Sequence, residues 1–105
     1  MSILHIASFR WKPEVAEIDI ARLTDALNEM RAGIPEIRSY VVGPNLHLRA
    51  GGADYGVAAI LDDGAGLDTY LDHVDHKAVY EKYLGWMIAE RSAVQLPISA
   101  GAFDA

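Results

Sequence analysis

The spacing of apolar residues switches between two periods along the chain, and the order of these periods constrains the fold most strongly. Side chains alternate over residues 3–11 and predict a strand that ends before Pro13. Apolar residues three and four positions apart over residues 17–34 predict a helix, which a glycine and a proline end. Residues 37–42 predict a second strand that runs into a turn and a long loop.

The second half of the chain again alternates strand and helix. Residues 55–61 are apolar or small at every position, which indicates a central strand covered on both faces. Helical spacing over residues 67–87 predicts a broken second helix, bent near Gly85. Residues 92–98 predict a last strand at a sheet edge, because Pro97 cannot donate to a neighbouring strand. This order is the ferredoxin-like split βαβ pattern, so the expected fold class is α+β with a four-stranded, mostly antiparallel sheet.

Two helices cover only one face of such a sheet, yet apolar residues occupy both faces. The residues expected on the uncovered face are Leu4, Ile6, Ala58, Ile60, Val94 and Leu96. A second copy of the chain, packed sheet against sheet about a two-fold axis, is the simplest source of the missing apolar surface. We therefore expect a homodimer formed through the sheet faces.

Composition narrows the class of partner. Fifteen Asp and Glu against nine Lys and Arg give a formal charge of −6, which repels nucleic acid and anionic membrane surfaces. The chain has no cysteine, which excludes disulfides, thiolate metal sites and thiol nucleophiles. The sequence shows no signal-peptide pattern and no apolar run of bilayer length. The expectation is one cytoplasmic domain over residues 1–99, followed by a short tail at residues 100–105.

Several short segments share a characteristic order and spacing: His5-Ile6, Phe9-Arg10-Trp11-Lys12, Ile34-Pro35, Gly43-Pro44-Asn45, Asp54-Tyr55, Tyr70-Leu71-Asp72-His73 and His76. Together they resemble the stress-responsive A/B barrel (Dabb) family of dimeric α+β barrels over nearly the whole chain. The resemblance implies that the sheets of two subunits close into a barrel. It also implies that a cavity forms between each sheet and its own helices.

Within this family the sequence is similar to olivetolic acid cyclase-type proteins, which close a polyketide by an aldol step without a cofactor. The similarity implies functional roles for His5 on the first strand and for Tyr70 and His76 on the second helix. Val57 stands where these proteins carry a histidine on the third strand, and Val74 where the family commonly has a proline. The similarity therefore implies the general chemistry without that substrate.

The same three side chains suit acid and base catalysis. Imidazole exchanges a proton near neutral pH, so His76 is the candidate general base; the alternative is a helix-start histidine that only bonds the backbone. Tyr70 can donate to an oxygen that gains negative charge, although tyrosines also pack in cores. His5 is either a polar wall of a pocket or a satisfied core histidine. The expected substrate-binding residues are Ala7, Phe9, Val57, Ala59, Tyr80 and Tyr83.

His73 and His76 have a spacing that can place two ligands on one metal ion, but further ligands would have to come from elsewhere. We expect neither a metal nor another cofactor. The leading hypothesis is a small cofactor-independent enzyme that performs enolate-type cyclisation, isomerisation or addition and elimination on an apolar or aromatic, polyketide-like carbonyl substrate. The alternatives are a non-enzymatic stress-responsive oligomer and, by analogy of fold, a cofactor-free monooxygenase.

Overall fold

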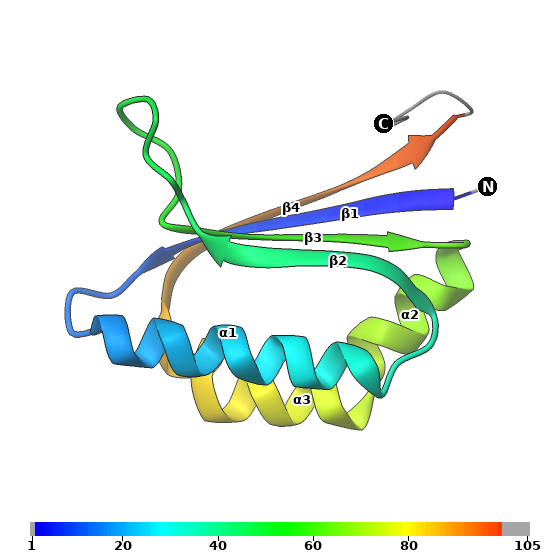
Figure 1. Cartoon of the computed structure of the whole chain (residues 1–105), viewed down its shortest axis with the longest axis horizontal. Helices are drawn as coiled ribbons and strands as arrows, with labels where there is room; N and C mark the ends of the chain where they lie inside the picture. Colours follow the sequence, from blue (N-terminus) through cyan, green and yellow to red (C-terminus); the bar gives the residue numbers. More distant parts are fainter. Residues whose placement is uncertain (1, 100–105) are drawn as a thin grey trace.

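One layer of sheet and one layer of helices make up residues 2–99, the part of the chain that the computed structural model describes (Figure 1). The strands are β1 (Ser2–Trp11), β2 (Ile37–Pro44), β3 (Tyr55–Leu61) and β4 (Ile88–Ile98). The helices are α1 (Glu17–Ala32), α2 (Gly64–Asp72), α3 (Val74–Val79) and α4 (Gly85–Met87), and the π-helical turn η1 (Tyr80–Leu84) joins the last two. The predicted tail, residues 100–105, lies outside the described residues.

The sheet has the strand order β2-β3-β1-β4, and every neighbouring pair is antiparallel. This order confirms the ferredoxin-like α+β fold, with β3 inside the sheet and β4 at its edge. β4 begins at Ile88, earlier than the predicted residue 92. A bulge in β4 at Ala89, opposite Arg10 and Trp11 of β1, lets Trp11 pair with Ile88, so the ladder extends beyond the alternating residues on which the prediction relied.

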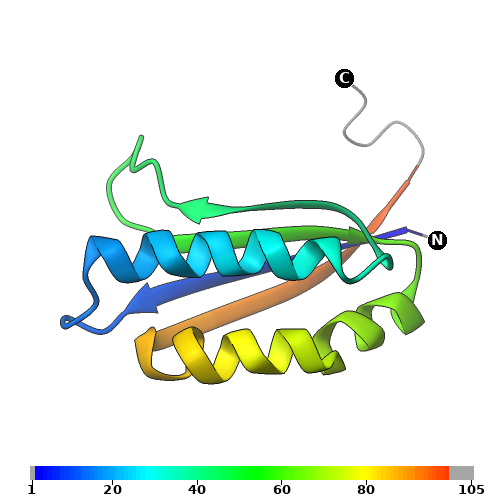
Figure 2. The same cartoon turned by 60° about the horizontal axis from the view of Figure 1, so that its bottom comes forward.

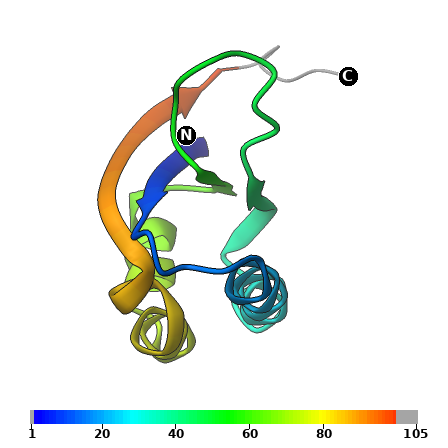
Figure 3. The same cartoon turned by 90° about the vertical axis from the view of Figure 1, so that its left-hand side faces the viewer.

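Helices α1 and α3 lie side by side on one face of the sheet (Figures 2 and 3). The apolar stripe of α1 supplies Leu23, Leu27 and Met30, which are all buried. They share one core cluster with Val57 and Leu61 of β3. Burying each large apolar side chain contributes about 1.5–3 kcal/mol, so this cluster holds the helices against the middle of the sheet. β4, in contrast, is exposed along almost its whole length.

The opposite face of the sheet has no helix over it within the described residues (Figure 3). On this face the side chains of Val41, Val94 and Leu96 are 67%, 46% and 44% exposed. The loop between β2 and β3 rises on the same side (Figure 1), and it exposes Leu46 and Leu48 at 80% and 84%. Exposed apolar side chains gathered on one face are typical of an interaction site.

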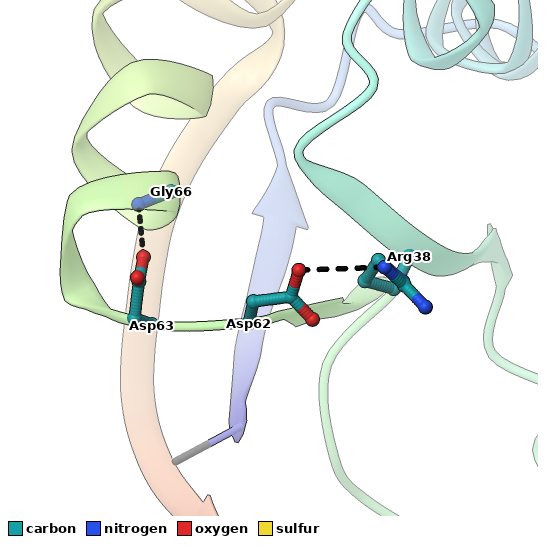
Figure 4. Close-up of polar contacts among 4 residues, drawn as sticks. All are labelled: Arg38, Asp62, Asp63 and Gly66. Carbon is teal, nitrogen blue, oxygen red and sulfur yellow. Dashed lines mark hydrogen bonds and ion pairs between the residues drawn. The ribbon is translucent and has the colours of Figure 1, made fainter.

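A carboxylate fixes the point at which α2, the helix that carries Tyr70, begins. Asp63 is the N-cap residue: its Oδ1 accepts a hydrogen bond from the backbone N–H of Gly66 at 2.8 Å (Figure 4). Beside it, Arg38 and Asp62 form an exposed ion pair at 3.4 Å, a contact of a kind that adds little stability. The cap satisfies a free N–H group at the helix start and thereby sets the point from which the helix runs to the buried Tyr70.

The second helical segment is broken as predicted, but the break lies at His73. The backbone of His73 is extended, and its Nδ1 accepts a hydrogen bond from the N–H of Asp75 at 3.0 Å, so this side chain caps α3. At Gly85, where a bend was predicted, the backbone is helical, and the preceding η1 turn contains the irregularity. The break at His73 starts a new helix whose first turn carries His76.

Candidate functional site

A cavity of about 350 Å³ lies between the sheet and the second helical segment. All four strands contribute to one wall, and α1, α2, α3 and η1 contribute to the other. The volume is at the small end of the range for ligand pockets, roughly 300–1,000 Å³. Most of the lining is apolar. The polar residues that line the cavity include His5, Tyr40, Tyr70, His76, Arg91, Ser92 and Gln95.

Tyr70 contacts both imidazoles that the sequence singled out. The centre of its ring is 6.2 Å from that of His5 and 5.1 Å from that of His76, and both contacts are edge-to-face. His5 comes from β1 and is paired with Ala59 of β3, which places it on the helix-facing side of the sheet. The structure therefore brings the three predicted side chains to one cavity, while their catalytic roles stay a prediction.

Tyr40, a residue that sequence reasoning did not select, completes this group. Its hydroxyl lies 3.1 Å from the hydroxyl of Tyr70. Burial raises the pKa of both phenols, and for Tyr40 the nearby Tyr70 adds to this effect. The hydrogen bond to Tyr40 lowers the pKa of Tyr70 and thus opposes burial, as expected when Tyr40 is the donor. Tyr70 then keeps its own proton at neutral pH and can donate it to a ligand.

A side-chain amide sets the protonation of His5. Nε2 of Gln95, on the neighbouring strand β4, lies 2.9 Å from Nδ1 of His5. An amide nitrogen only donates, so Nδ1 accepts and the proton of the neutral ring sits on Nε2. Burial lowers the pKa of His5, which favours this neutral form. His5 is therefore a hydrogen-bond donor on the cavity wall and not a cation.

His76 is half-buried, and its pKa is lowered, chiefly by burial. The backbone of Leu71 and the Asp72 carboxylate act in the opposite direction, and the neighbouring histidines His5 and His73 favour the neutral ring further. A neutral imidazole beside a cavity can accept a proton. His76 thus has the protonation state that a general base needs near neutral pH.

The cavity takes in four of the six predicted substrate-binding residues: Ala7, Phe9, Val57 and Tyr80. Ala59 does not line it, because this residue is fully buried in the core cluster. Tyr83 does not line it either and faces a separate depression beside α1. The π-helical turn widens the helix, so that Tyr80 and Leu84 reach the cavity while Tyr83 turns away.

Sequence reasoning missed Arg91 and Gln95 of β4 as well as Tyr40. The sequence could have indicated Gln95, because it stands between Val94 and Leu96 of the open face and its side chain therefore points to the helix-facing side. Arg91 precedes the predicted start of the strand, and so it was not assigned to a face.

Within residues 2–99, no group of three or more His, Cys, Asp or Glu side chains is placed to hold a metal ion. His73 uses its Nδ1 to cap α3. Among the described helices, none has the length and apolar character needed to cross a membrane.

These features define a ferredoxin-like α+β domain with a cavity between its sheet and its helices. The chain belongs to the stress responsive A/B barrel domain (Dabb) family, whose model matches residues 3–96. A dimeric ferredoxin-like protein of unknown function from Thermobifida fusca YX is 40% identical, with a TM-score of 0.86 over 93% of this chain and 92% of that chain.

Two more distant structures share the fold. A Dabb family protein from Mesorhizobium loti MAFF303099 is 16% identical, with a TM-score of 0.77 over 93% of this chain and 98% of that chain. A hydroxynitrile lyase from Passiflora edulis is 14% identical, with a TM-score of 0.80 over 94% of each chain. At such identities the likeness shows the fold alone. No curated protein sequence matches the chain significantly.

Proposed function

We propose that the protein is a small cofactor-independent enzyme that moves a proton at the carbon next to a carbonyl group of an apolar or aromatic substrate. The observation that carries this proposal is the convergence of the His5 and His76 imidazoles on the Tyr70 phenol at one cavity. A purely structural role does not require such a set, because protein cores are filled mainly by apolar side chains.

His76 is the proposed general base. Its neutral ring removes a proton from the α-carbon, and the electron pair of that C–H bond forms the carbon–carbon double bond of an enolate. The π electron pair of the carbonyl group moves onto its oxygen. The His76 imidazolium then returns a proton to the α-carbon, which regenerates the ketone, or delivers it to another carbon of a conjugated enolate, which completes an isomerisation. In a cyclisation, the enolate carbon instead attacks a second carbonyl, and the imidazolium protonates the new alkoxide.

Tyr70 and His5 are the proposed donors to the enolate oxygen. When Tyr40 is the donor in its hydrogen bond with Tyr70, the Tyr70 hydroxyl becomes a stronger donor to a ligand. Gln95 holds His5 in the tautomer that keeps a proton on Nε2. Fixed donors in a site of low polarity stabilise developing charge without reorganising, and one such donor contributes about 10²–10³-fold in rate.

Exchange of α-protons with solvent tests the proposal without knowledge of the natural substrate. The probe is 4-benzoylbutanamide, a neutral aryl ketone, in deuterium oxide, and proton NMR measures the loss of its α-proton signal. Wild-type protein is expected to accelerate this exchange. His76→Asn is expected to reduce the acceleration about 10²–10⁴-fold, the usual contribution of a positioned base.

His47→Asn is the matched control, because His47 is exposed in the loop between β2 and β3 and is not among the cavity-lining residues. Its left-handed backbone, with φ of 52°, is one that asparagine tolerates. This variant is expected to exchange protons at the wild-type rate. Equal exchange by wild type and His76→Asn, or no acceleration by either, refutes the proposed chemistry and leaves a non-enzymatic oligomer as the better description.

We also propose that the open face of the sheet pairs with a second copy of the chain, as the apolar exposure of this face and the dimeric Thermobifida fusca structure suggest. Val41→Glu places a charge on this face, whereas Val74→Glu changes an equally exposed valine on the helical side; the two are 67% and 72% exposed. Light scattering is expected to give a dimer mass for wild type and Val74→Glu and a lower mass for Val41→Glu. A monomeric wild type, or the same mass for both variants, contradicts the dimer.

A further inference from the structure

We propose that Arg91 makes the cavity selective for carbonyl compounds that carry a carboxylate at the end distant from the reacting carbonyl. This inference rests on the proposed function, because it names the class of substrate for the same site. The carboxylate would pair with the guanidinium at the edge of the cavity, and the carbonyl would reach Tyr70 and the two imidazoles.

Arg91 supplies the single fixed charge among the described residues that line the cavity. Within residues 2–99 the lining contains no Asp, Glu or Lys, and its two histidines are neutral near pH 7, as burial lowers the pKa of each. A guanidinium stays charged at every physiological pH. The described part of the cavity therefore carries one positive charge, although the chain as a whole carries a formal charge of −6.

This guanidinium has no carboxylate partner within residues 2–99, unlike two other arginines of the sheet. Arg10 pairs with Glu90 at 3.6 Å, and Arg38 pairs with Asp62 at 3.4 Å. Arg10 precedes Trp11 on β1 and is not among the cavity-lining residues. The acidic residue next to Arg91 is thus occupied by Arg10, and the Arg91 side chain is left with its hydrogen-bond donors available to a ligand.

The sheet register fixes where the charge lies relative to the reactive groups. Arg91 is paired with Phe9, and Gln95 is paired with His5. Four residues of strand separate the two levels, about 13 Å between Cα atoms at ~3.3 Å per residue. Part of this distance is bridged by the long arginine side chain. A ligand that reaches both levels carries its acid several bonds away from its carbonyl, with an apolar middle against Ala7 and Ala93.

The single guanidinium of Arg91 favours a carboxylate over a phosphate as its ligand. One planar guanidinium matches one carboxylate with two parallel hydrogen bonds. A phosphate group would bring about two negative charges, and no second cation lines the described part of the cavity to balance them. The mostly apolar remainder suits an aryl or alkyl chain.

Binding of a matched pair of probes tests the inference. The acid is 4-benzoylbutanoate, and its neutral counterpart is 4-benzoylbutanamide; both are titrated by calorimetry into wild type, Arg91→Gln and Arg10→Gln. Wild type is expected to bind the acid about tenfold more tightly than the amide, the low end for a hydrogen-bonded ion pair because Arg91 is exposed. Arg91→Gln is expected to bind both probes with equal affinity, and Arg10→Gln is expected to keep the wild-type preference.

Three results would overturn the inference: no preference for the acid in wild type, no binding of the acid, or an equal loss of preference in both arginine variants. The last result would mean that only net charge matters. Benzoylformate carries its acid next to its carbonyl. Arg91→Gln is expected to bind it less than twofold more weakly than wild type does. A tenfold weaker binding would overturn the distance assigned between Arg91 and the reactive groups.

Failure of this inference is distinguishable from failure of the proposed function. His76→Asn is expected to reduce the acceleration of α-proton exchange about 10²–10⁴-fold while it keeps the preference for acid over amide. Exchange that depends on His76 without any effect of Arg91 on binding refutes the selectivity alone. Binding that depends on Arg91, with exchange that does not depend on His76, refutes the proton-transfer chemistry alone.

Discussion

Replacing Tyr70 by phenylalanine removes one hydroxyl group and keeps the ring that contacts both imidazoles. The lost hydrogen bond joins the buried Tyr70 to the half-buried Tyr40 at 3.1 Å, and its net contribution to stability is about 1 kcal/mol. The Tyr40 hydroxyl then lacks its partner, which can raise the total cost to about 3 kcal/mol. We expect α-proton exchange of 4-benzoylbutanamide to fall about 10²-fold or more, because one donor to the enolate oxygen is missing.

Tyr55→Phe separates the chemical effect from the structural one. Tyr55 is 1% exposed, and its hydroxyl lies 2.8 Å from Oγ1 of Thr24, away from the cavity. Urea unfolding is expected to show a similar loss of stability for Tyr55→Phe and Tyr70→Phe, of order 1 kcal/mol. The exchange rate is expected to drop only in Tyr70→Phe. Equal exchange rates in the two variants would refute the role of the Tyr70 hydroxyl.

Four further predictions concern protonation and the helix start. Because burial lowers the pKa of His76 below 6.5, exchange is expected to stay constant above that pH and to fall as pH drops through the lower folded value; a fall that begins above pH 7 contradicts the assignment. The lowered pKa values of His5 and His76 also predict that the free energy of unfolding, measured in urea, decreases as pH falls below 6.5, since the unfolded chain then binds more protons. Nitrogen-15 NMR is expected to show His5 protonated at Nε2 in wild type and a mixture of tautomers in Gln95→Leu, and an unchanged tautomer would remove Gln95 from the account. Asp63→Ala is expected to cost about 1 kcal/mol of stability through loss of the helix cap, and no change in the urea midpoint would contradict this.

The fold was predictable because local spacing and global packing agree along most of the chain. The alternation in β1 placed His5 on the helix-facing side, where it lies in the structure. The order of strands and helices left one arrangement of the sheet, which the strand order confirms. Pro97 correctly placed β4 at the edge, since a proline cannot serve a central strand.

The site was only partly predictable, because two irregularities break the periods from which faces are read. In β2 a bulge between Ile37 and Ser39 puts Ile37 and Tyr40 on the same face of the sheet. Strict alternation from Ile37 would point Tyr40 to the open face, away from Tyr70. The π-helical turn likewise shifts the period on the helical side. Leu84 therefore lines the cavity in place of the predicted Tyr83.

Arg91 was missed for a different reason. The apolar alternation that marks β4 begins only at Ala93 and Val94, whereas the backbone pairing with β1 begins at Ile88. Backbone hydrogen bonds extend a strand over residues whose side chains carry no periodic signal. A charged residue at such a position is assigned to a face only once the register is known.

A histidine NMR titration tests most directly whether the two imidazoles share one cavity. The chain has four histidines, so His47 and His73 serve as internal references for His5 and His76. On addition of 4-benzoylbutanamide, the ring signals of His5 and His76 are predicted to shift together with one dissociation constant, while those of His47 and His73 stay in place. A titration in which His5 or His76 stays silent, or in which all four rings shift alike, would contradict the account.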